Sequence, residues 1–372
     1  MSSGKQAPNA LASADQQLAS MSLDDGAAGG AGDGDDDDDK FCSNCGKTGD
    51  DLKGCNSCRC IRYCSAKCQK KHWKHHKVDC RRIKAALSDK TRPEYCCVDL
   101  TEARMDISGL FDQPPPPPDC AICMMPVPIY ESDGTSMSAH APCCGTIICH
   151  ACDFEACKAK AMLNIKRKQK KQPPMRHCCE FCRAPIGIDV SDKEMIRICT
   201  DRYKGRAEKN DHEAIWELAG AHRNRNDTSR LQVPFNEEKA LELAKRAADL
   251  GNDKAQLHLG LWYEQGHLGL NVDKERARDL WESAAKGGNV KARFALGRDE
   301  CSKGDIIDGV RHLHIAAASG YSAAMDALIL FFERGLLRHK DLAKSLRAKD
   351  KACLDMRSDS RDRYLAQSKA NR

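Results

Sequence analysis

Cysteine and histidine side chains gather between residues 42 and 80 at spacings that suit a metal ion. Two C-x-x-C pairs come first, and two further pairs follow whose members lie four residues apart. The eight candidate ligands are Cys42, Cys45, Cys55, Cys58, Cys64, Cys68, His76 and Cys80. A C-x-x-C turn directs two thiolates at one ion, and residues four apart share one face of a helix. Eight ligands are enough for two closed tetrahedral Zn²⁺ sites, with disulfides or scattered thiols as the alternative.

This stretch resembles the MYND zinc finger. Besides the two opening knuckles, the features that carry the resemblance are Tyr63-Cys64-Ser65, Cys68-Gln69, Trp73 and His76-x-x-x-Cys80. The resemblance implies interleaved sites, with Cys42, Cys45, Cys64 and Cys68 on one ion and Cys55, Cys58, His76 and Cys80 on the other, a pairing that spacing alone leaves open. Protein ligands fill every position, so we expect structural ions that supply most of the stability of so short a segment. Cys60 is a spare thiol.

A second group of candidate ligands lies between residues 120 and 182 and consists of Cys120, Cys123, Cys143, Cys144, Cys149, Cys152, Cys179 and Cys182. Their order resembles a RING finger, or an all-cysteine variant in which a CCG sequence supplies the third and fourth ligands. The resemblance implies a cross-brace, with Cys120, Cys123, Cys149 and Cys152 on one Zn²⁺ and Cys143, Cys144, Cys179 and Cys182 on the other. Gly145 would help the backbone to turn there. His150, Cys157, His177 and Cys178 are neighbours that could substitute for a ligand.

RING fingers commonly act as ubiquitin ligases, which hold a ubiquitin-conjugating enzyme in a reactive geometry. The resemblance implies that Ile122 contacts that enzyme and that Arg183 contacts both enzyme and ubiquitin. Core packing of Ile122 and a surface salt bridge of Arg183 are the alternatives. Two features depart from the family: Glu180 replaces its usual proline, and the gap before Cys179 is long. That gap holds seven Lys or Arg from Lys158 to Lys171, which suits nuclear import, nucleic-acid contact or a solvated loop.

From about residue 190 onward, Ala, Leu and Gly recur at helical spacing. The sequences AQLHLG at Ala255, ARFALG at Ala292 and AMDALI at Ala324 repeat at intervals of 37 and 32 residues, after a weaker copy at Ala214. Gly251, Gly288 and Gly320 end the second helix of each copy, where glycine suits a left-handed cap. The copies resemble the Sel-like branch of the tetratricopeptide repeats, roughly over 211–335. The resemblance implies stacked helix pairs that bind protein partners, or a scaffold that spaces the zinc modules.

The predicted fold class is a multidomain chain, with two small zinc-stabilised modules followed by an all-α helical-repeat solenoid. The predicted boundaries are a disordered acidic tail (1–40), the MYND-type finger (41–88), a linker with five prolines that form a stiff spacer (89–119), the RING-like finger with its basic insert (120–188), the repeats (205–338) and a charged, helix-prone C-terminal tail (339–372).

Cysteine usage also bears on the compartment. Of 23 cysteines, 20 lie between Cys42 and Cys182, a concentration that favours metal binding inside the cell over disulfides. The first residues lack the apolar core of a secretory signal, and no run of 18 apolar residues is present. We therefore expect a cytoplasmic or nuclear protein without a membrane span. The net charge of +6 is too small to indicate a nucleic-acid binder.

Two functional hypotheses follow. The first is an adaptor whose MYND finger and repeats bind proteins, with proline-containing peptides among the candidate ligands. The second is a RING-type ubiquitin ligase that positions a ubiquitin-conjugating enzyme. Nucleic-acid binding ranks third, because the basic insert lacks interleaved aromatic residues. MYND fingers also occur in lysine methyltransferases beside a SET domain, but no SET-like sequence is present, so we do not expect methyl transfer.

Overall fold

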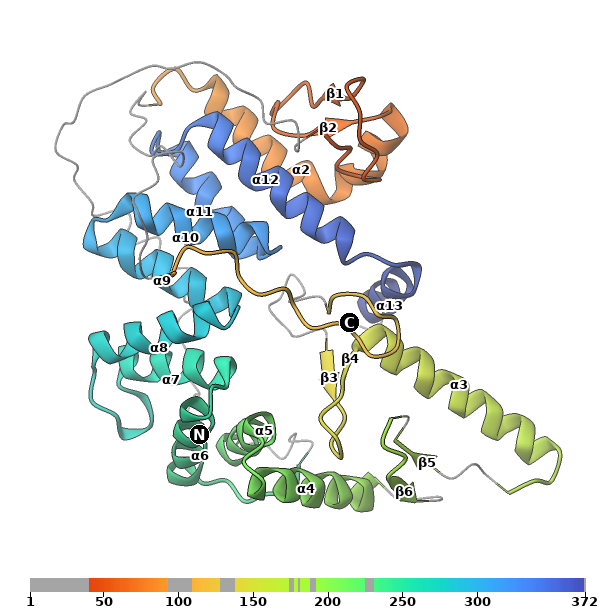
Figure 1. Ribbon diagram of the computed structural model, residues 1–372. Helices are drawn as coiled ribbons and strands as arrows, with labels where there is room; N and C mark the ends of the chain where they lie inside the picture. Colours follow the sequence, from red (N-terminus) through yellow and green to blue (C-terminus); the bar gives the residue numbers. More distant parts are fainter. Residues whose placement is uncertain are drawn as a thin grey trace, which may run out of the picture. The chain divides into compact units, whose positions relative to one another are not determined.

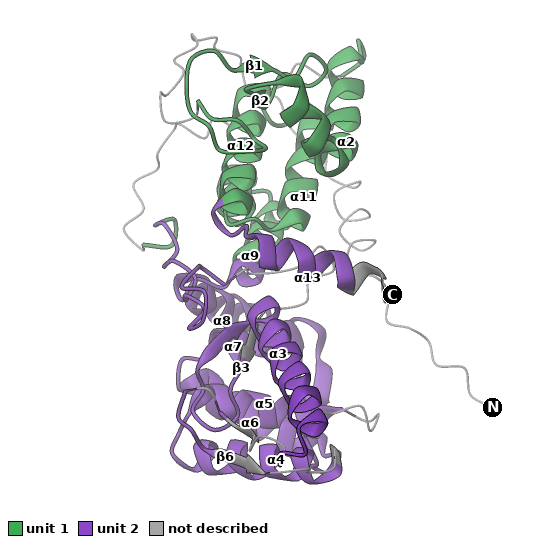
Figure 2. Cartoon of the chain, turned by 90° about the vertical axis from the view of Figure 1, so that its right-hand side faces the viewer, with its two compact units in different colours: residues 1–111, 293–354 green, residues 112–292, 355–372 purple. Residues whose placement is uncertain are grey.

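The computed structural model describes residues 40–92, 109–127, 138–173, 177–179, 181–187, 192–224 and 231–370 (Figure 1). The predicted acidic tail up to residue 39 and Glu180 lie outside these ranges. The chain forms two compact units, one from residues 1–111 and 293–354 and the other from residues 112–292 and 355–372 (Figure 2). Each unit therefore combines one cysteine-rich region with helices from later in the chain. None of the helices in the described ranges has the length and apolar character needed to cross a bilayer.

The cysteine-rich part of the first unit is a small hairpin followed by one long helix. Strands β1 (Lys53–Gly54) and β2 (Arg62–Tyr63) pair antiparallel, and α2 (Ala66–Ser88) follows. The Ser65 hydroxyl caps this helix by accepting a hydrogen bond from the Cys68 backbone N–H at 3.2 Å. His76, Cys80, Ile83 and Ala86 are buried at spacings of three or four residues, so they form a single face of α2.

Helices from the C-terminal part of the chain complete the first unit. They are α9 (Val290–Lys303), which begins just before the unit boundary, α10 (Ile306–Ala318), α11 (Ser322–Glu333) and α12 (His339–Asp355). The sequence predicts a charged, helix-prone tail from residue 339, and α12 begins there with Leu342, Ala343 and Leu346 buried. These three residues share one face of the helix. The many charged residues on its other faces make the overall composition polar, so the composition does not indicate this apolar face.

Contacts from α11 and α12 hold the finger of the first unit. The Arg82 guanidinium of α2 makes two hydrogen bonds with the Glu333 carboxylate, at 2.9 and 2.8 Å, and a third with Asp326 at 3.3 Å. From α12, Arg347 donates to the Cys60 carbonyl at 3.0 Å, and Lys349 lies 3.4 Å from the Asp79 carboxylate. Acidic side chains of α11 thus pair with Arg82, and basic side chains of α12 bind the finger from the other helix of the same unit.

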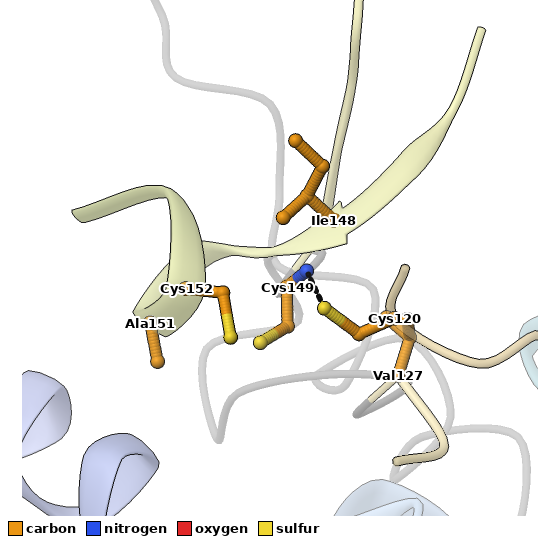
Figure 3. Close-up of a cluster of buried hydrophobic side chains, with 6 residues drawn as sticks. All are labelled: Cys120, Val127, Ile148, Cys149, Ala151 and Cys152. Carbon is orange, nitrogen blue, oxygen red and sulfur yellow. Dashed lines mark hydrogen bonds between the residues drawn. The ribbon is translucent and has the colours of Figure 1, made fainter. Parts of the chain in front are cut away.

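The cysteine-rich part of the second unit contains two hairpins and a helix. Strand β3 (Ser138–His140) pairs with β4 (Ile147–Cys149), α3 (His150–Gln169) follows at once, and β5 (His177–Cys178) pairs with β6 (Pro185–Gly187). The basic insert is helical as far as Gln169. A small core contains Val127, Ile148 and Ala151 together with three cysteines (Figure 3). Tyr364 of α13 (Asp359–Ala370) packs against this core.

Antiparallel helices form the rest of the second unit. They are α4 (Asp192–Glu208), α5 (His212–Arg223), α6 (Glu237–Asp249), α7 (Asp253–Gln265), the short 3-10 helix η2 (His267–Gly269) and α8 (Lys274–Lys286). Glycine at position 260 of α7 has a steric cause, because a Cβ there would lie 2.5 Å from Trp281 Nε1 of α8. Gly251, Gly288 and Gly320 have φ of 87°, 93° and 91°, which confirms the predicted left-handed turns.

Candidate metal centres

The first group of predicted ligands comes together around the opening knuckle of the first unit. The sulfur atoms of Cys42, Cys45, Cys64 and Cys68 all lie within 4.8 Å of one another. The Cys45–Cys64 and Cys64–Cys68 separations are 3.6 and 3.5 Å. Four sulfurs at about 2.3 Å from a tetrahedral Zn²⁺ would be about 3.8 Å apart, whereas a disulfide needs about 2.05 Å. The group therefore has the size of a tetrathiolate zinc site.

The second group, Cys55, Cys58, His76 and Cys80, is buried throughout and has the same compact geometry. Cys55 Sγ is 3.7 Å from Cys80 Sγ, and Cys58 Sγ is 3.3 Å from His76 Nε2. Burial lowers the pKa of His76 to about 4, so its imidazole is neutral at physiological pH. A neutral imidazole has the free lone pair that a metal ion requires. The His72 ring stacks on His76 with 5.9 Å between centroids and fixes its orientation.

Cys60, the spare thiol of the sequence, belongs to neither group. Its sulfur lies 3.3 Å from His339 Nε2 of α12, and the same His339 nitrogen lies 2.7 Å from the Cys58 carbonyl oxygen. His339 thus connects α12 to the finger at the backbone of the predicted ligand Cys58 and at the side chain of Cys60. Local sequence patterns could not have identified this contact, because the two residues are 279 positions apart.

The third group, Cys120, Cys123, Cys149 and Cys152, lies in the core of the second unit, where Figure 3 shows the sulfurs of Cys120, Cys149 and Cys152 turned toward one another. The Cys149 backbone N–H donates to Cys120 Sγ at 3.2 Å. Burial by itself raises the pKa of the Cys120 thiol, but N–H donors from the backbone of Cys149, Cys123 and Ile122 lower the pKa to about 7. Such donors favour the thiolate, which is the form that binds metal.

A buried arginine that sequence patterns missed supports this third group. Arg361 of α13 is only 3% exposed. Its Nη2 lies 3.5 Å from Cys123 Sγ and 3.4 Å from the Met125 carbonyl, and its Nη1 donates to the Pro126 carbonyl at 2.8 Å. Four thiolates on one Zn²⁺ carry a net charge of −2, so a guanidinium within hydrogen-bonding reach of a sulfur offsets part of that charge.

The fourth group, Cys143, Cys144, Cys179 and Cys182, is more exposed than the third. Cys182 Sγ is 3.3 Å from Cys143 Sγ, and Cys144 Sγ is 3.8 Å from Cys179 Sγ. Gly145 turns the backbone with φ of 74°, as predicted. Arg206 of α4 packs directly over this turn and donates to the carbonyls of Ala141 and Pro142 at 3.3 and 3.4 Å. Helix α4, which precedes the Sel1-like copies, therefore holds the loop that carries two predicted ligands.

The other sequence-predicted residues lie at the surface or beside the groups. Ile122 is 44% exposed, which disfavours the core-packing alternative, and Arg183 is exposed too. The His150 ring packs against Tyr364, and Cys157 is exposed on α3. His177 and Cys178 are described only as part of strand β5. None of His150, Cys157, His177 and Cys178 belongs to a four-residue group formed by described residues.

Comparisons with known proteins identify two kinds of module. The family model of the MYND finger matches residues 42–80, and that of the Sel1 repeat matches residues 212–252 and 253–289. These matches cover the predicted copies at Ala214 and Ala255. The copies predicted at Ala292 and Ala324 fall in the helix pairs α9–α10 and α11–α12 and remain predictions.

Curated relatives share only the finger. SET domain-containing protein 14 of Caenorhabditis elegans and the human histone-lysine N-methyltransferase SMYD3 are each 46% identical over 44 residues, which are 12% of this chain and 10% of each relative. SET domain and MYND-type zinc finger protein 6 of Schizosaccharomyces pombe is 34% identical over 57 residues, 15% of this chain and 12% of that protein. The chain thus matches about a tenth of the length of these relatives.

Two solved structures are similar to the helical part. A Sel1 repeat protein from Oxalobacter formigenes is 28% identical with a TM-score of 0.30, over 34% of this chain and 93% of that one. A protective antigen of uropathogenic Escherichia coli with an SLR fold is 23% identical with a TM-score of 0.33, over 44% and 35%. The family matches and the Cys/His groups together confirm the predicted fold class and indicate zinc binding. The chain carries a MYND zinc finger and Sel1 repeats, two kinds of module that generally mediate contacts between proteins.

Proposed function

We propose that this protein is a zinc-dependent adaptor whose MYND finger and Sel1 repeats bind protein partners, while four zinc ions hold the chain in its binding-competent shape. The observation that carries the proposal is the convergence of all sixteen predicted ligands into four closed groups of four. A tetrahedral ion with four protein ligands has no position left for a substrate or water, so its role is structural.

Apolar side chains on α2 offer a surface for a partner. Trp73, Val78 and Leu87 are exposed on this helix although they are large and apolar. Trp73 is 38% exposed and packs edge-on against the ring of His76, with 6.4 Å between centroids. Exposed aromatic rings provide the flat apolar contact that proline-containing peptides use. We therefore place a proline-containing peptide against Trp73.

Binding of a proline-peptide library to the full chain and to Trp73→Ala tests the adaptor. We expect Trp73→Ala to weaken the best peptide by about tenfold or more, since truncating an aromatic anchor costs about 2 kcal/mol. Lys84→Ala, at an exposed residue of the same helix that is not part of the apolar surface, is the matched control and should leave the affinity unchanged. Zinc per chain, measured by mass spectrometry, should stay near four in every sample. Unchanged affinity in Trp73→Ala would remove the assigned role of α2.

A RING-type ubiquitin ligase is the second candidate, and the exposure of Ile122 and Arg183 next to the third and fourth groups favours it. Autoubiquitination with a panel of conjugating enzymes separates the candidates, with Cys120→Ala and Ile122→Ala as variants. Activity that is lost in both variants would establish a ligase. Four zinc ions per chain without activity across the panel would favour the adaptor. Only two ions per chain would contradict a cross-brace in residues 120–182.

A further inference from the structure

The end of the linker in the first unit packs against repeat helices. Leu110 is 7% exposed, and its backbone carbonyl accepts a hydrogen bond from Arg293 Nη1 of α9 at 2.6 Å. Arg293 itself is 2% exposed. A hydrogen bond from a buried charged donor is among the stronger ones that proteins form. It is directed at main-chain oxygen, so it would recognise any peptide that presents a carbonyl in this place.

The next linker residue, Phe111, lies between two side chains of α10. Its ring lies against His312 with 4.5 Å between centroids and a tilt of 31°, and the Arg311 guanidinium carbon lies 3.8 Å from the ring centroid. His312 is completely buried. A second ring and a cation placed on one aromatic ring are features of a site that selects an aromatic side chain.

The linker therefore does more than separate two modules, which was its predicted role. A buried donor binds its backbone carbonyl, and Arg311 and His312 contact its half-buried aromatic ring, a combination found in peptide-binding surfaces. Of the five prolines that follow, Pro114 to Pro118, Pro115 lies close to the repeats in the second unit. A Cβ at Gly288 would lie 3.0 Å from Pro115 Cγ there, so glycine is needed for the close approach.

We propose that Leu110 and Phe111 are an internal ligand of a peptide-binding surface formed by Arg293, Arg311 and His312. A partner peptide with Leu-Phe ahead of a proline-rich stretch binds this surface by displacing the linker. The inference rests on the proposed adaptor function and names the class of peptide that the repeats accept. A tethered ligand acts at an effective concentration in the millimolar range, so the linker attenuates binding of the partner.

The test uses a fluorescein-labelled peptide with the sequence of residues 109–118, GLFDQPPPPP. Anisotropy measures its binding to the full wild-type chain and to the full chain carrying Leu110→Ala and Phe111→Ala. Because the altered linker no longer competes, we expect the double variant to bind the peptide about tenfold or more tightly than wild type. A peptide with Ala in the place of Phe111 should bind the two chains with equal affinity, because only binding through Trp73 remains.

Two further variants locate the binding site. Arg311→Ser added to the double variant should remove the gain in affinity over wild type, because the cation over the ring is lost. Trp73→Ala added to the double variant should leave that gain in place, since binding through Trp73 belongs to the MYND finger. A gain that persists with Arg311→Ser, or that is lost with Trp73→Ala, would overturn the site.

Equal affinity of the peptide for wild type and the double variant would contradict the proposal that Leu110 and Phe111 act as an internal ligand. No binding to either chain at millimolar peptide would contradict the proposed peptide-binding surface. Circular dichroism and zinc per chain must match wild type, and Phe111→Ala alone replaces the double variant if they do not. Failure here leaves the Trp73-dependent binding of the proposed adaptor intact, so the two failures are distinguishable.

Discussion

The two cysteine-rich regions are both too short to form a large apolar core, and different contacts with later helices stabilise each of them. The MYND finger brings a long helix of its own, and α11 and α12 hold it through ion pairs and hydrogen bonds such as those of Arg82 and His339. The region from Cys120 to Cys182 places arginines from distant helices beside its ligand loops, Arg361 at the third group and Arg206 at the fourth. Both regions depend on later parts of the chain, because neither has enough apolar residues for a core of its own.

Ligand charge accounts for part of the difference. The fully buried group of the MYND finger contains one histidine, so its zinc complex would carry a charge of −1. The buried group at Cys120 contains four cysteines, and its complex would carry −2. The larger buried charge needs a cation nearby, and Arg361 supplies one. The other two all-cysteine groups are partly exposed, and water can stabilise their charge.

Metal removal should have the largest effect in both regions. Structural zinc contributes about 10–16 kcal/mol to folding of small modules, so a strong chelator should unfold both fingers while the helices of the repeats persist. Release should be faster from the two partly exposed groups than from the two buried ones. Chelator absorbance with parallel far-UV circular dichroism follows both events. Simultaneous release from all four groups would contradict the ranking by burial.

Arg361→Met should weaken the second unit selectively. It removes a buried cation next to Cys123, and breaking a buried charged contact costs about 3 kcal/mol. We expect a lower unfolding midpoint in urea and faster zinc release. Arg363→Met is the matched control on the same helix, because Arg363 is exposed and 3.9 Å from Glu155. If the two variants behave alike, Arg361 does not compensate the charge of the third group.

Lowering the pH should reduce the stability of the repeats through His258, which is not a predicted metal ligand. Burial, with smaller effects of Arg223 and Lys291, lowers the pKa of His258 from 6.5 to about 4. The unfolded chain binds this proton more readily, so the contribution of neutral His258 is complete above pH 6.5 and is lost as the pH falls toward 4, up to about 3 kcal/mol. Urea unfolding between pH 7 and 4 measures the loss. His258→Gln should flatten the profile without changing zinc release over that range.

Gly260→Ala should destabilise the repeats and leave metal content unchanged. The added methyl group would lie 2.5 Å from Trp281 Nε1 and 3.0 Å from the Ala277 carbonyl, so α7 and α8 must move apart at a cost of about 2 kcal/mol. Gly220→Ala is the control, because its Cβ would meet open space and alanine favours a helix by about 1 kcal/mol. Thermal unfolding should therefore shift in opposite directions for the two variants.

Arg82→Ala should have the smallest effect, although this arginine makes more ion pairs than Arg361. Its side chain and that of Glu333 are 30% and 29% exposed, so water screens the contact and its loss should cost about 1 kcal/mol or less. Urea unfolding of Arg82→Ala beside Arg361→Met compares the two regions directly. A larger loss of unfolding free energy in Arg82→Ala than in Arg361→Met would show that ion pairs contribute more to the stability of the MYND finger than to that of the second unit.

Local spacing was enough to predict which side chains come together. Ligand pairs such as Cys55 and Cys58, or His76 and Cys80, are set by one turn or one helical step, and the family resemblance supplied the pairing between them. The left-handed glycines of the repeats are local as well. Arg361, Arg206 and His339 could not be predicted, because they reach their partners across large sequence separations and lie in no motif. The stripe of Leu342, Ala343 and Leu346 was hidden by surrounding charge.

The contact between Arg361 and Cys123 also determines when the third group acquires its full surroundings during synthesis of the protein. The ribosome adds Arg361 238 residues after Cys123. At about 5–20 residues per second, the thiols of the third group would wait on the order of 10 to 50 seconds for the guanidinium that completes their surroundings. During that interval the nascent chain presents reactive sulfur to oxidants and competing metals. Synthesis of Arg361 therefore completes the surroundings of this centre, and a chain stopped before Arg361 would lack the cation beside Cys123.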